Sequence, residues 1–179
     1  QDGGRRAVTA RESSLVYVVD DDPAIRDSLQ HLLESVGLRA LGFADVETFL
    51  TAYQPDRPGC LLLDIRIPGC NNLTSQQLLR ERDIDIPVII VTGHGDVAMA
   101  VTAMKQGALD FIEKPFNDQM LLDCVHNALA EDRVRRCTRA QRQQLLERFG
   151  TLTPREQDVL HQVVEGLSNR EIADLLHLS

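Results

Sequence analysis

Short aliphatic runs alternate with helix-like segments along the first part of the chain, and this alternation limits the fold more than any other sequence feature. Four runs are almost continuously apolar, and a weaker fifth at residues 39–43 is predicted to turn Leu41 and Phe43 inward. The four stronger runs are residues 15–19, 60–63, 88–91 and 109–112. Runs of this kind, bounded by turn residues, indicate strands that are covered on both faces.

The segments between these runs have helical patterns with recognisable ends. The predicted helices are residues 23–36, 45–53, 74–82 and 96–106. Asp22 can cap the first helix, with Pro23 at its first position, and Thr74 begins a capping box. Gly37 and Gly107 are expected to end two of the helices. Alternating strands and helices predict an α/β fold with a five-stranded, doubly wound parallel sheet of order 2-1-3-4-5.

The pattern changes after Pro115. One long helix is predicted from residue 117, with Leu121 and Val125 on its apolar face. Residues 131–150 are rich in Arg and contain no Pro, so we expect them to continue as a semi-rigid helical linker with a solvated face. Contact of these Arg residues with nucleic acid or lipid is the less favoured interpretation.

Two further helix starts follow the linker. Capping boxes begin at Thr153 and Ser168, and they predict helices at residues 154–165 and 169–177. A Gly-Leu-Ser turn joins the two helices. The segment 151–179 therefore looks like the beginning of a helix-turn-helix.

Composition excludes several classes of protein. Hydrophobic residues make up 43% of the chain but aromatic residues only 4%, so the core is expected to be aliphatic. No run reaches the roughly 18 apolar residues of a membrane span, and the N-terminal residues lack the apolar stretch of a signal peptide. We therefore expect a cytoplasmic protein with no membrane contact. The cysteines show no metal-ligand spacing and are expected to be free thiols: Cys60, Cys70, Cys124 and Cys137.

Polar side chains follow four of the predicted strands, at the point where each strand ends. In chain order these residues are Asp20, Asp21, Asp22, Asp64, Thr92 and Lys114. Because the carboxyl ends of parallel strands meet at one edge of a sheet, we expect these groups to lie close together. Each residue alone has an ordinary explanation as a helix cap or a surface residue. Their occurrence at four strand ends favours a functional site.

The chemistry of this combination indicates phosphoryl transfer. Clustered carboxylates repel one another and favour a hard cation such as Mg²⁺. A carboxylate can also attack phosphorus and form an aspartyl phosphate. Such a transfer needs mainly positioning and neutralisation of oxygen charge, which Mg²⁺ and a lysine can supply. The hydroxyl of Thr92 can bond a phosphoryl oxygen.

The motifs VVDDD, LLLDIRIPG, VIIVTGHGD and DFIEKPF, in this order, resemble the receiver domain of two-component response regulators. They are most similar to the FixJ-like group, which includes the styrene-response regulator, and the resemblance covers residues 14–130. It implies that Asp64 is the phosphoacceptor. It further implies that Mg²⁺ is held by Asp20, Asp21, Asp64 and the backbone carbonyl of Arg66.

The same resemblance assigns roles at the last two strands. Lys114 is expected to contact the phosphoryl group through its ammonium and to precede a cis peptide at Pro115. Thr92 is the switch hydroxyl, and Phe111 is the aromatic residue that reorients with it. The loop after Asp64 departs from the family pattern, with Asn residues in place of a usual Gly. His94 could reach the phosphoryl group, although a solvated loop histidine is the favoured interpretation.

A second resemblance covers residues 151–179. LTPREQDVL and EGLSNREIADLLHLS are similar to the first half of the LuxR/NarL-type helix-turn-helix. In that family the next helix reads bases in the major groove. Because the sequence stops before that helix, the domain is expected to be incomplete, with its recognition helix missing. Specific binding to promoter DNA is then expected of the full-length protein only.

The leading prediction is a transcriptional regulator that receives a phosphoryl group from a sensor histidine kinase, with Mg²⁺. Phosphorylation is then expected to control DNA binding, either through formation of a homodimer or through release of the C-terminal domain. It is not expected to be an enzyme, beyond assisting its own phosphorylation and dephosphorylation. Two alternatives stay open. One is a truncated receiver that acts as a phosphate sink or a protein-interaction module. The other is a phosphatase or mutase, but haloacid-dehalogenase-type enzymes have a second Asp where this chain has Arg66.

Overall fold

The computed structural model describes residues 14–64, 66, 72–93 and 97–164. It divides the chain into two compact units, one that ends at Arg135 and one that begins at Arg136. None of the helices in the described part of the chain is both long and apolar enough to cross a membrane.

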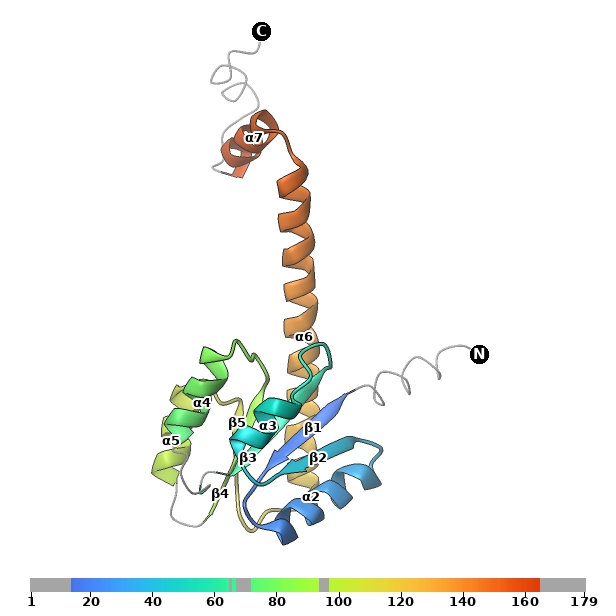
Figure 1. The fold of residues 1–179 in the computed structure, drawn as a ribbon, viewed down its shortest axis with the longest axis vertical. Coiled ribbons are helices and arrows are strands. Elements are labelled where there is room, and N and C mark those ends of the chain that lie inside the picture. Colours follow the sequence, from blue (N-terminus) through green and yellow to red (C-terminus); the bar gives the residue numbers. More distant parts are fainter. Residues whose placement is uncertain (1–13, 65, 67–71, 94–96, 165–179) are drawn as a thin grey trace, which may run out of the picture. The chain divides into compact units, whose positions relative to one another are not determined.

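The first unit is built on a parallel sheet of five strands in the order β2-β1-β3-β4-β5 (Figure 1). Its strands are β1 (Leu15–Val19), β2 (Arg39–Phe43), β3 (Gly59–Asp64), β4 (Val88–Thr92) and β5 (Asp110–Glu113). All four strand pairs are parallel, so every strand ends at the same edge of the sheet. The predicted fold class and strand order are confirmed.

Helices connect the strands at close to the predicted positions. They are α2 (Pro23–Ser35), α3 (Val46–Ala52), α4 (Asn72–Glu81) and α5 (Val97–Lys105). Asp22 caps α2 as predicted, because its carboxylate accepts a hydrogen bond of 2.9 Å from the Ala24 backbone N–H. Gly37 and Gly107 have positive φ values of 80° and 104°, which explains why glycine follows α2 and α5. The capping box at Thr74 is wrong as a helix start, since α4 begins at Asn72.

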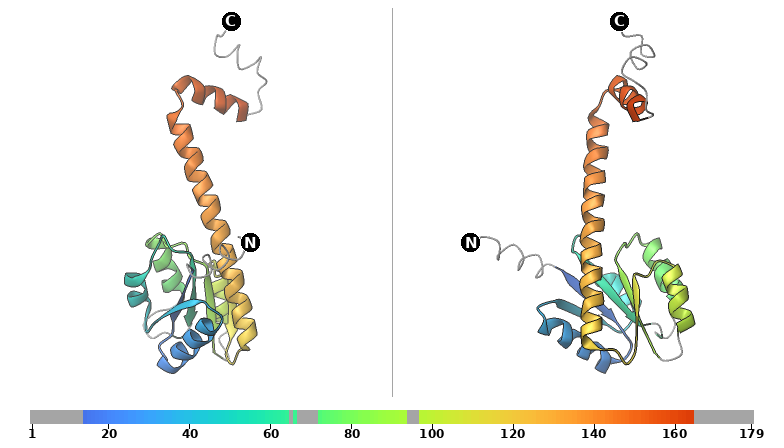
Figure 2. Two further views of the ribbon diagram at one scale, coloured as in Figure 1. Left: turned by 90° about the vertical axis from the view of Figure 1, so that its right-hand side faces the viewer. Right: turned by 180° about the vertical axis from the view of Figure 1, so that it is seen from behind.

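The strand side chains alternate between two apolar layers, one on each face of the sheet. On one face α2 and the first turns of α6 (Asp118–Thr151) cover side chains such as Val16, Leu62 and Ile89. On the other face α3, α4 and α5 cover side chains such as Tyr17 and Ile90. Figures 1 and 2 show α4 and α5 together on one side of the sheet and the start of α6 on the other. Both layers are mainly aliphatic, as predicted.

An aromatic cluster lies between β1 and α3 in the second layer. The ring of Tyr17 is fully buried, 5.1 Å from the ring of Phe49 and 5.7 Å from that of Tyr53. Phe43 joins this cluster as predicted, but the prediction that Leu41 turns into the core is wrong, because Leu41 is exposed and Ala40 is buried instead. β2 is an edge strand, so Leu41 has a strand neighbour on one side only.

The packing of the first unit extends along α6 beyond residue 130. The Asp132 side chain on α6 is buried, and its carboxylate accepts a hydrogen bond of 3.0 Å from the Gly59 backbone N–H at the start of β3. Gly59 has no room for a side chain, since a Cβ there would lie 2.3 Å from the Leu15 carbonyl oxygen. One helical turn later, Arg135 pairs with Asp85 at 3.2 Å. These contacts fix α6 against the edge of the sheet where the strands begin.

We expect Asp132→Ala to lower the free energy of unfolding of the first unit by about 1–3 kcal/mol, because the buried N–H of Gly59 loses its acceptor. Asp132→Asn is the matched control, since its amide oxygen can still accept that hydrogen bond. Urea denaturation followed by circular dichroism measures both. Equal stability of Asp132→Ala and the unsubstituted protein would contradict this role.

The second unit contains the rest of α6 and α7 (Pro154–Val164). Residues 131–150 are helical, as predicted for the linker. The capping box at the start of α7 is confirmed: the Thr153 backbone N–H donates to the Glu156 carboxylate at 2.8 Å, and the Glu156 N–H donates to the Thr153 hydroxyl at 3.4 Å. The helix predicted at residues 169–177 lies outside the described residues.

Candidate functional site

The candidate site lies at the edge of the sheet where the strands end. Asp20 follows β1, Asp64 is the last residue of β3, and Thr92 is the last residue of β4. Lys114 follows β5, and its backbone N–H donates to the Thr92 carbonyl at 2.7 Å. The parallel sheet therefore brings together the residues that the sequence placed at separate strand ends.

Lys114 connects two of the carboxylates. Its ammonium lies 2.9 Å from Oδ2 of Asp20 and 3.1 Å from Oδ2 of Asp64. The side chains of Asp20 and Asp64 are only 2% and 7% exposed, whereas the Lys114 side chain is 21% exposed. The carboxylates of Asp20 and Asp64 are thus held in place by the ends of their strands and by the ammonium of Lys114.

Backbone groups hold the second oxygen of each carboxylate. The Asp22 N–H donates to Oδ1 of Asp20 at 2.9 Å, and the Arg66 N–H donates to Oδ1 of Asp64 at 3.1 Å. These hydrogen bonds fix the orientation of both carboxylates, whose oxygens can still accept further contacts. Arg26, which the sequence analysis did not identify, donates from its guanidinium to the backbone carbonyl of Asp20 at 2.7 Å. Its place one turn into α2, within reach of the end of β1, is the signal that could have found it.

Burial and charge act in opposite directions on these groups. Burial raises the pKa of the Asp20 carboxyl above its ordinary value, more than the hydrogen bond from Lys114 lowers it. Burial alone would lower the pKa of Lys114, but the bonds and charges of Asp20 and Asp64 outweigh it and raise that pKa. Both pKa values can be raised at the same time, because Lys114 faces two carboxylates, whereas Asp20 faces one ammonium and one carboxylate of like charge. Lys114 is therefore charged at neutral pH.

The carboxylates of Asp20, Asp21 and Asp64 fit a divalent cation. One oxygen from each lies within 4.8 Å of the others, and Asp21 is exposed while its two neighbours are buried. Three carboxylates and one ammonium give the cluster a net charge of −2 (−3 + 1). Oxygen ligands with excess negative charge are the set that Mg²⁺ prefers. The acidic cluster predicted from the sequence is thus present, with an opening on the Asp21 side.

Thr92 and Phe111 lie on the same face of neighbouring strands. Phe111 is opposite Ile90 and Glu113 is opposite Thr92, so alternation along the strands directs Thr92 and Phe111 to the α5 side. The Thr92 hydroxyl is fully buried and, within the described ranges, has no hydrogen-bond partner. Phe111 is exposed at the surface. A buried hydroxyl without a partner is costly unless another state of the protein satisfies it.

Two predictions at this edge have no structural outcome. His94 lies outside the described residues. Arg66 is described as an exposed turn residue, and its carbonyl stays a predicted metal ligand. The peptide bond between Lys114 and Pro115 is cis, as the resemblance implied.

Comparison with known families gives two matches. Residues 16–126 match the family described as "Response regulator receiver domain". Residues 150–179 match the family described as "Bacterial regulatory proteins, luxR family". The first match includes every residue of the site described above, and the second begins at the end of α6.

Individual proteins are similar over nearly the whole chain. Nodulation protein W of Bradyrhizobium diazoefficiens is 45% identical over 170 residues, which cover 95% of this chain and 75% of that protein. The transcriptional regulatory protein FixJ of the same organism is 40% identical over 158 residues, covering 88% of this chain and 77% of that protein. Among solved structures, the response regulator StyR superposes with a TM-score of 0.79 at 41% identity, covering 93% of this chain and 84% of that chain.

Proposed function

The chain belongs to the FixJ-like transcriptional response regulators, with a receiver domain followed by a LuxR-type DNA-binding domain, and on this premise we propose that phosphorylation of Asp64 switches it between two states. The observation that carries the proposal is the pairing of Lys114 with both Asp20 and Asp64, beside a buried Thr92 hydroxyl that has no hydrogen-bond partner among the described residues. A carboxylate nucleophile, a cation and a hydroxyl donor are the groups that a phosphoryl acceptor needs.

The proposed transfer uses the side chains in fixed roles. A carboxylate oxygen of Asp64 attacks the phosphorus of a phosphohistidine on the sensor kinase. The new O–P bond forms as the P–N bond breaks, and the imidazole leaves with the electron pair. The Lys114 ammonium, now 3.1 Å from Asp64, then neutralises a phosphoryl oxygen. The Arg66 N–H keeps the attacking carboxylate in one orientation.

We assign the binding of Mg²⁺ to Asp20, Asp21 and Asp64, together with the backbone carbonyl of Arg66. When bound, Mg²⁺ supplies positive charge to phosphoryl oxygens that one lysine alone leaves unbalanced. Arg26 positions this set indirectly, because it holds the main chain of Asp20.

The proposed switch begins at Thr92. A phosphoryl group on Asp64 offers the buried hydroxyl the acceptor that it lacks among the described residues. Movement of Thr92 toward Asp64 opens space on the α5 side, and Phe111 is the side chain on the next strand that can fill it. We propose that the surface for homodimerisation is formed by exposed apolar side chains of α5, β5 and the start of α6. These are Met99, Val101, Phe111 and Met120.

We expect beryllofluoride, a phosphoryl mimic, to change amide hydrogen exchange in α5, β5 and the start of α6, and to shift the protein toward a dimer. Thr92→Ala should abolish the exchange change, whereas Thr92→Ser, which keeps the hydroxyl, should retain it. Hydrogen-exchange mass spectrometry and analytical ultracentrifugation measure the two effects. Identical exchange with and without beryllofluoride would contradict the switch.

The proposed partners are a sensor histidine kinase and promoter DNA, both in the cytoplasm. We propose that residues 14–130 carry the phosphorylation chemistry, that 131–150 form the linker, and that 151–179 contribute the first part of the DNA-binding domain. The match of residues 150–179 to the luxR family supports the last assignment. We assign base readout to the recognition helix that follows residues 151–179 in that family, and not to α7.

A further inference from the structure

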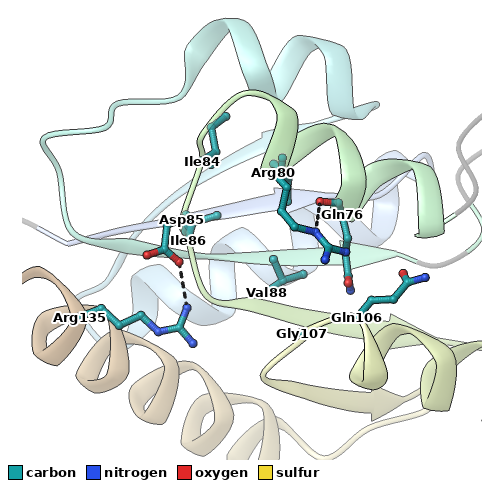
Figure 3. A pocket seen from close by; sticks show the side chains of 10 residues that line it. Gln76, Arg80, Ile84, Asp85, Ile86, Val88, Gln106, Gly107 and Arg135 are labelled. Atoms are coloured by element: carbon teal, nitrogen blue, oxygen red, sulfur yellow. Dashed lines mark hydrogen bonds and ion pairs between the residues drawn. The ribbon is translucent and has the colours of Figure 1, made fainter. Parts of the chain in front are cut away.

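A cavity of about 210 Å³ lies at the opposite edge of the sheet from Asp64. It is lined by α4, by the segment before β4, by the turn after α5 and by Arg135 of α6 (Figure 3). Val88, the first residue of β4, lies at this cavity, while Thr92, the last, lies at the phosphorylation site. Four residues of strand separate the two places by about 13 Å. The cavity is therefore distinct from the acidic cluster.

Two glutamine side chains bring unpartnered acceptors to the cavity. Oε1 of Gln76 and Oε1 of Gln106 are buried atoms that have no hydrogen-bond partner within residues 14–164 as far as these are described. Gln76 is only 5% exposed. Its Nε2 donates to the Ala103 carbonyl at 3.2 Å, which can only accept, so the orientation of this amide is settled. Both oxygens can accept hydrogen bonds from N–H or O–H groups of a bound molecule.

One cation at the cavity is not committed to an acid. Arg80 uses its Nε in a hydrogen bond of 3.4 Å to its own helix, at the Gln76 carbonyl, and its terminal nitrogens have no ion-pair partner in the described chain. Arg135 differs, because it pairs with Asp85 at 3.2 Å and with Glu131 at 3.1 Å. The planar fork of Arg80 is therefore free to bind a carboxylate. Figure 3 shows Arg80 and Gln76 extending from the same helix toward the cavity.

The rest of the wall consists of aliphatic side chains and of the Asp85–Arg135 ion pair, and the volume is small. Leu79, Ile86 and Val88 are buried side chains that line the cavity. A volume of about 210 Å³ has room for several waters or for a small organic molecule. Drug-sized ligands occupy larger pockets, from about 300 Å³ upward.

We infer that this cavity binds a small α-amino acid with an apolar side chain. Its carboxylate pairs with the Arg80 guanidinium, its ammonium donates to the two glutamine oxygens, and its side chain packs on the aliphatic wall. Such an amino acid supplies the hydrogen-bond donors, the carboxylate and the apolar side chain that complement the groups lining the cavity. A bound ligand holds α4 and the turn after α5 together, so it stabilises the first unit against unfolding.

The test is a titration of the full chain with L-leucine, followed by heteronuclear NMR at the amides of Arg80, Gln106 and Gly107. We expect saturable shifts there and a higher melting temperature. Two analogues dissect the recognition: 4-methylpentanoate lacks the amino group, and 3-methylbutylamine lacks the carboxylate. Each should bind about 10- to 100-fold more weakly than leucine, since each loses charged hydrogen bonds. No saturable binding of leucine, or equal affinity for 4-methylpentanoate, overturns the inference.

Variants separate this site from adventitious binding. Arg80→Ala and Gln106→Leu should each weaken leucine binding about tenfold or more. Arg39→Ala is the matched control, because Arg39 is an exposed arginine on the edge strand β2, away from the cavity, and it should leave the affinity unchanged. Loss of affinity in all three variants, or in none, would overturn the assignment. A melting curve without ligand confirms that each variant is folded.

Discussion

Asp64→Asn should abolish phosphoryl uptake by this protein. Incubation of the unsubstituted chain with acetyl phosphate and Mg²⁺ is expected to add one phosphoryl group that is stable in acid and labile in alkali. The amide that replaces the Asp64 carboxylate is a poor nucleophile and carries no charge for Lys114. Intact-mass measurement after a fixed incubation should therefore show full labelling of the parent and none of the variant.

The fold should survive this substitution, which makes the result easy to interpret. Asparagine has nearly the shape of aspartate, its amide oxygen can still accept from the Arg66 N–H, and Lys114 keeps its pair with Asp20 at 2.9 Å. Asp56→Asn is a control of the same chemistry at an exposed carboxylate outside the cluster, and it should be labelled like the parent. Persistent labelling of Asp64→Asn would show that another residue is the phosphoacceptor.

Asp21→Ala should remove most of the affinity for Mg²⁺. The substitution reduces the negative charge of the cluster from −2 to −1 and removes its exposed carboxylate, the one on the open side. We expect a loss of at least the roughly 10- to 100-fold that follows removal of a residue which only orients a metal ligand. Calorimetric titration with MgCl₂ measures the affinity directly, and acetyl phosphate labelling should fall in parallel.

Asp22→Asn provides the matched comparison for Asp21→Ala. It removes one negative charge from the adjacent position, but Asp22 is not among the clustered carboxylates, and asparagine can still cap α2 through its side-chain oxygen. Mg²⁺ affinity should therefore be nearly unchanged in Asp22→Asn. An equal loss in both variants would point to a general effect of charge rather than to coordination by Asp21.

The sheet and the acidic cluster could be predicted because their signals are local. β1, β3 and β4 are buried and mainly aliphatic runs, and Asp20, Asp64 and Thr92 lie directly at their ends. Parallel pairing then brings the strand ends together without any further information. Caps such as Asp22 and Thr153 were predictable for the same reason, since the residue and its partner lie within three positions of each other.

Contacts between distant segments could not be predicted in this way. Asp132 stands in a polar, Arg-rich stretch, and nothing local distinguishes a buried carboxylate that accepts from Gly59 from a solvated one. Leu41 was misassigned because alternation does not reveal which strand is at the edge of the sheet. The acceptors at the cavity, Gln76 of α4 and Gln106 of the turn after α5, line the same cavity only after the fold has formed.

The aromatic cluster beside α3 determines what intrinsic fluorescence can detect in this protein. The chain has two tyrosines and no tryptophan, so its intrinsic emission comes from Tyr17 and Tyr53, whose rings are 5.7 Å apart. β3 and β4 separate β1 from β5, a spacing of about 14 Å. Intrinsic emission therefore reports the loss of packing between β1 and α3 and is insensitive to rearrangement at β5. A single tryptophan in place of Phe111 gives an optical signal from that strand with no competing tryptophan background.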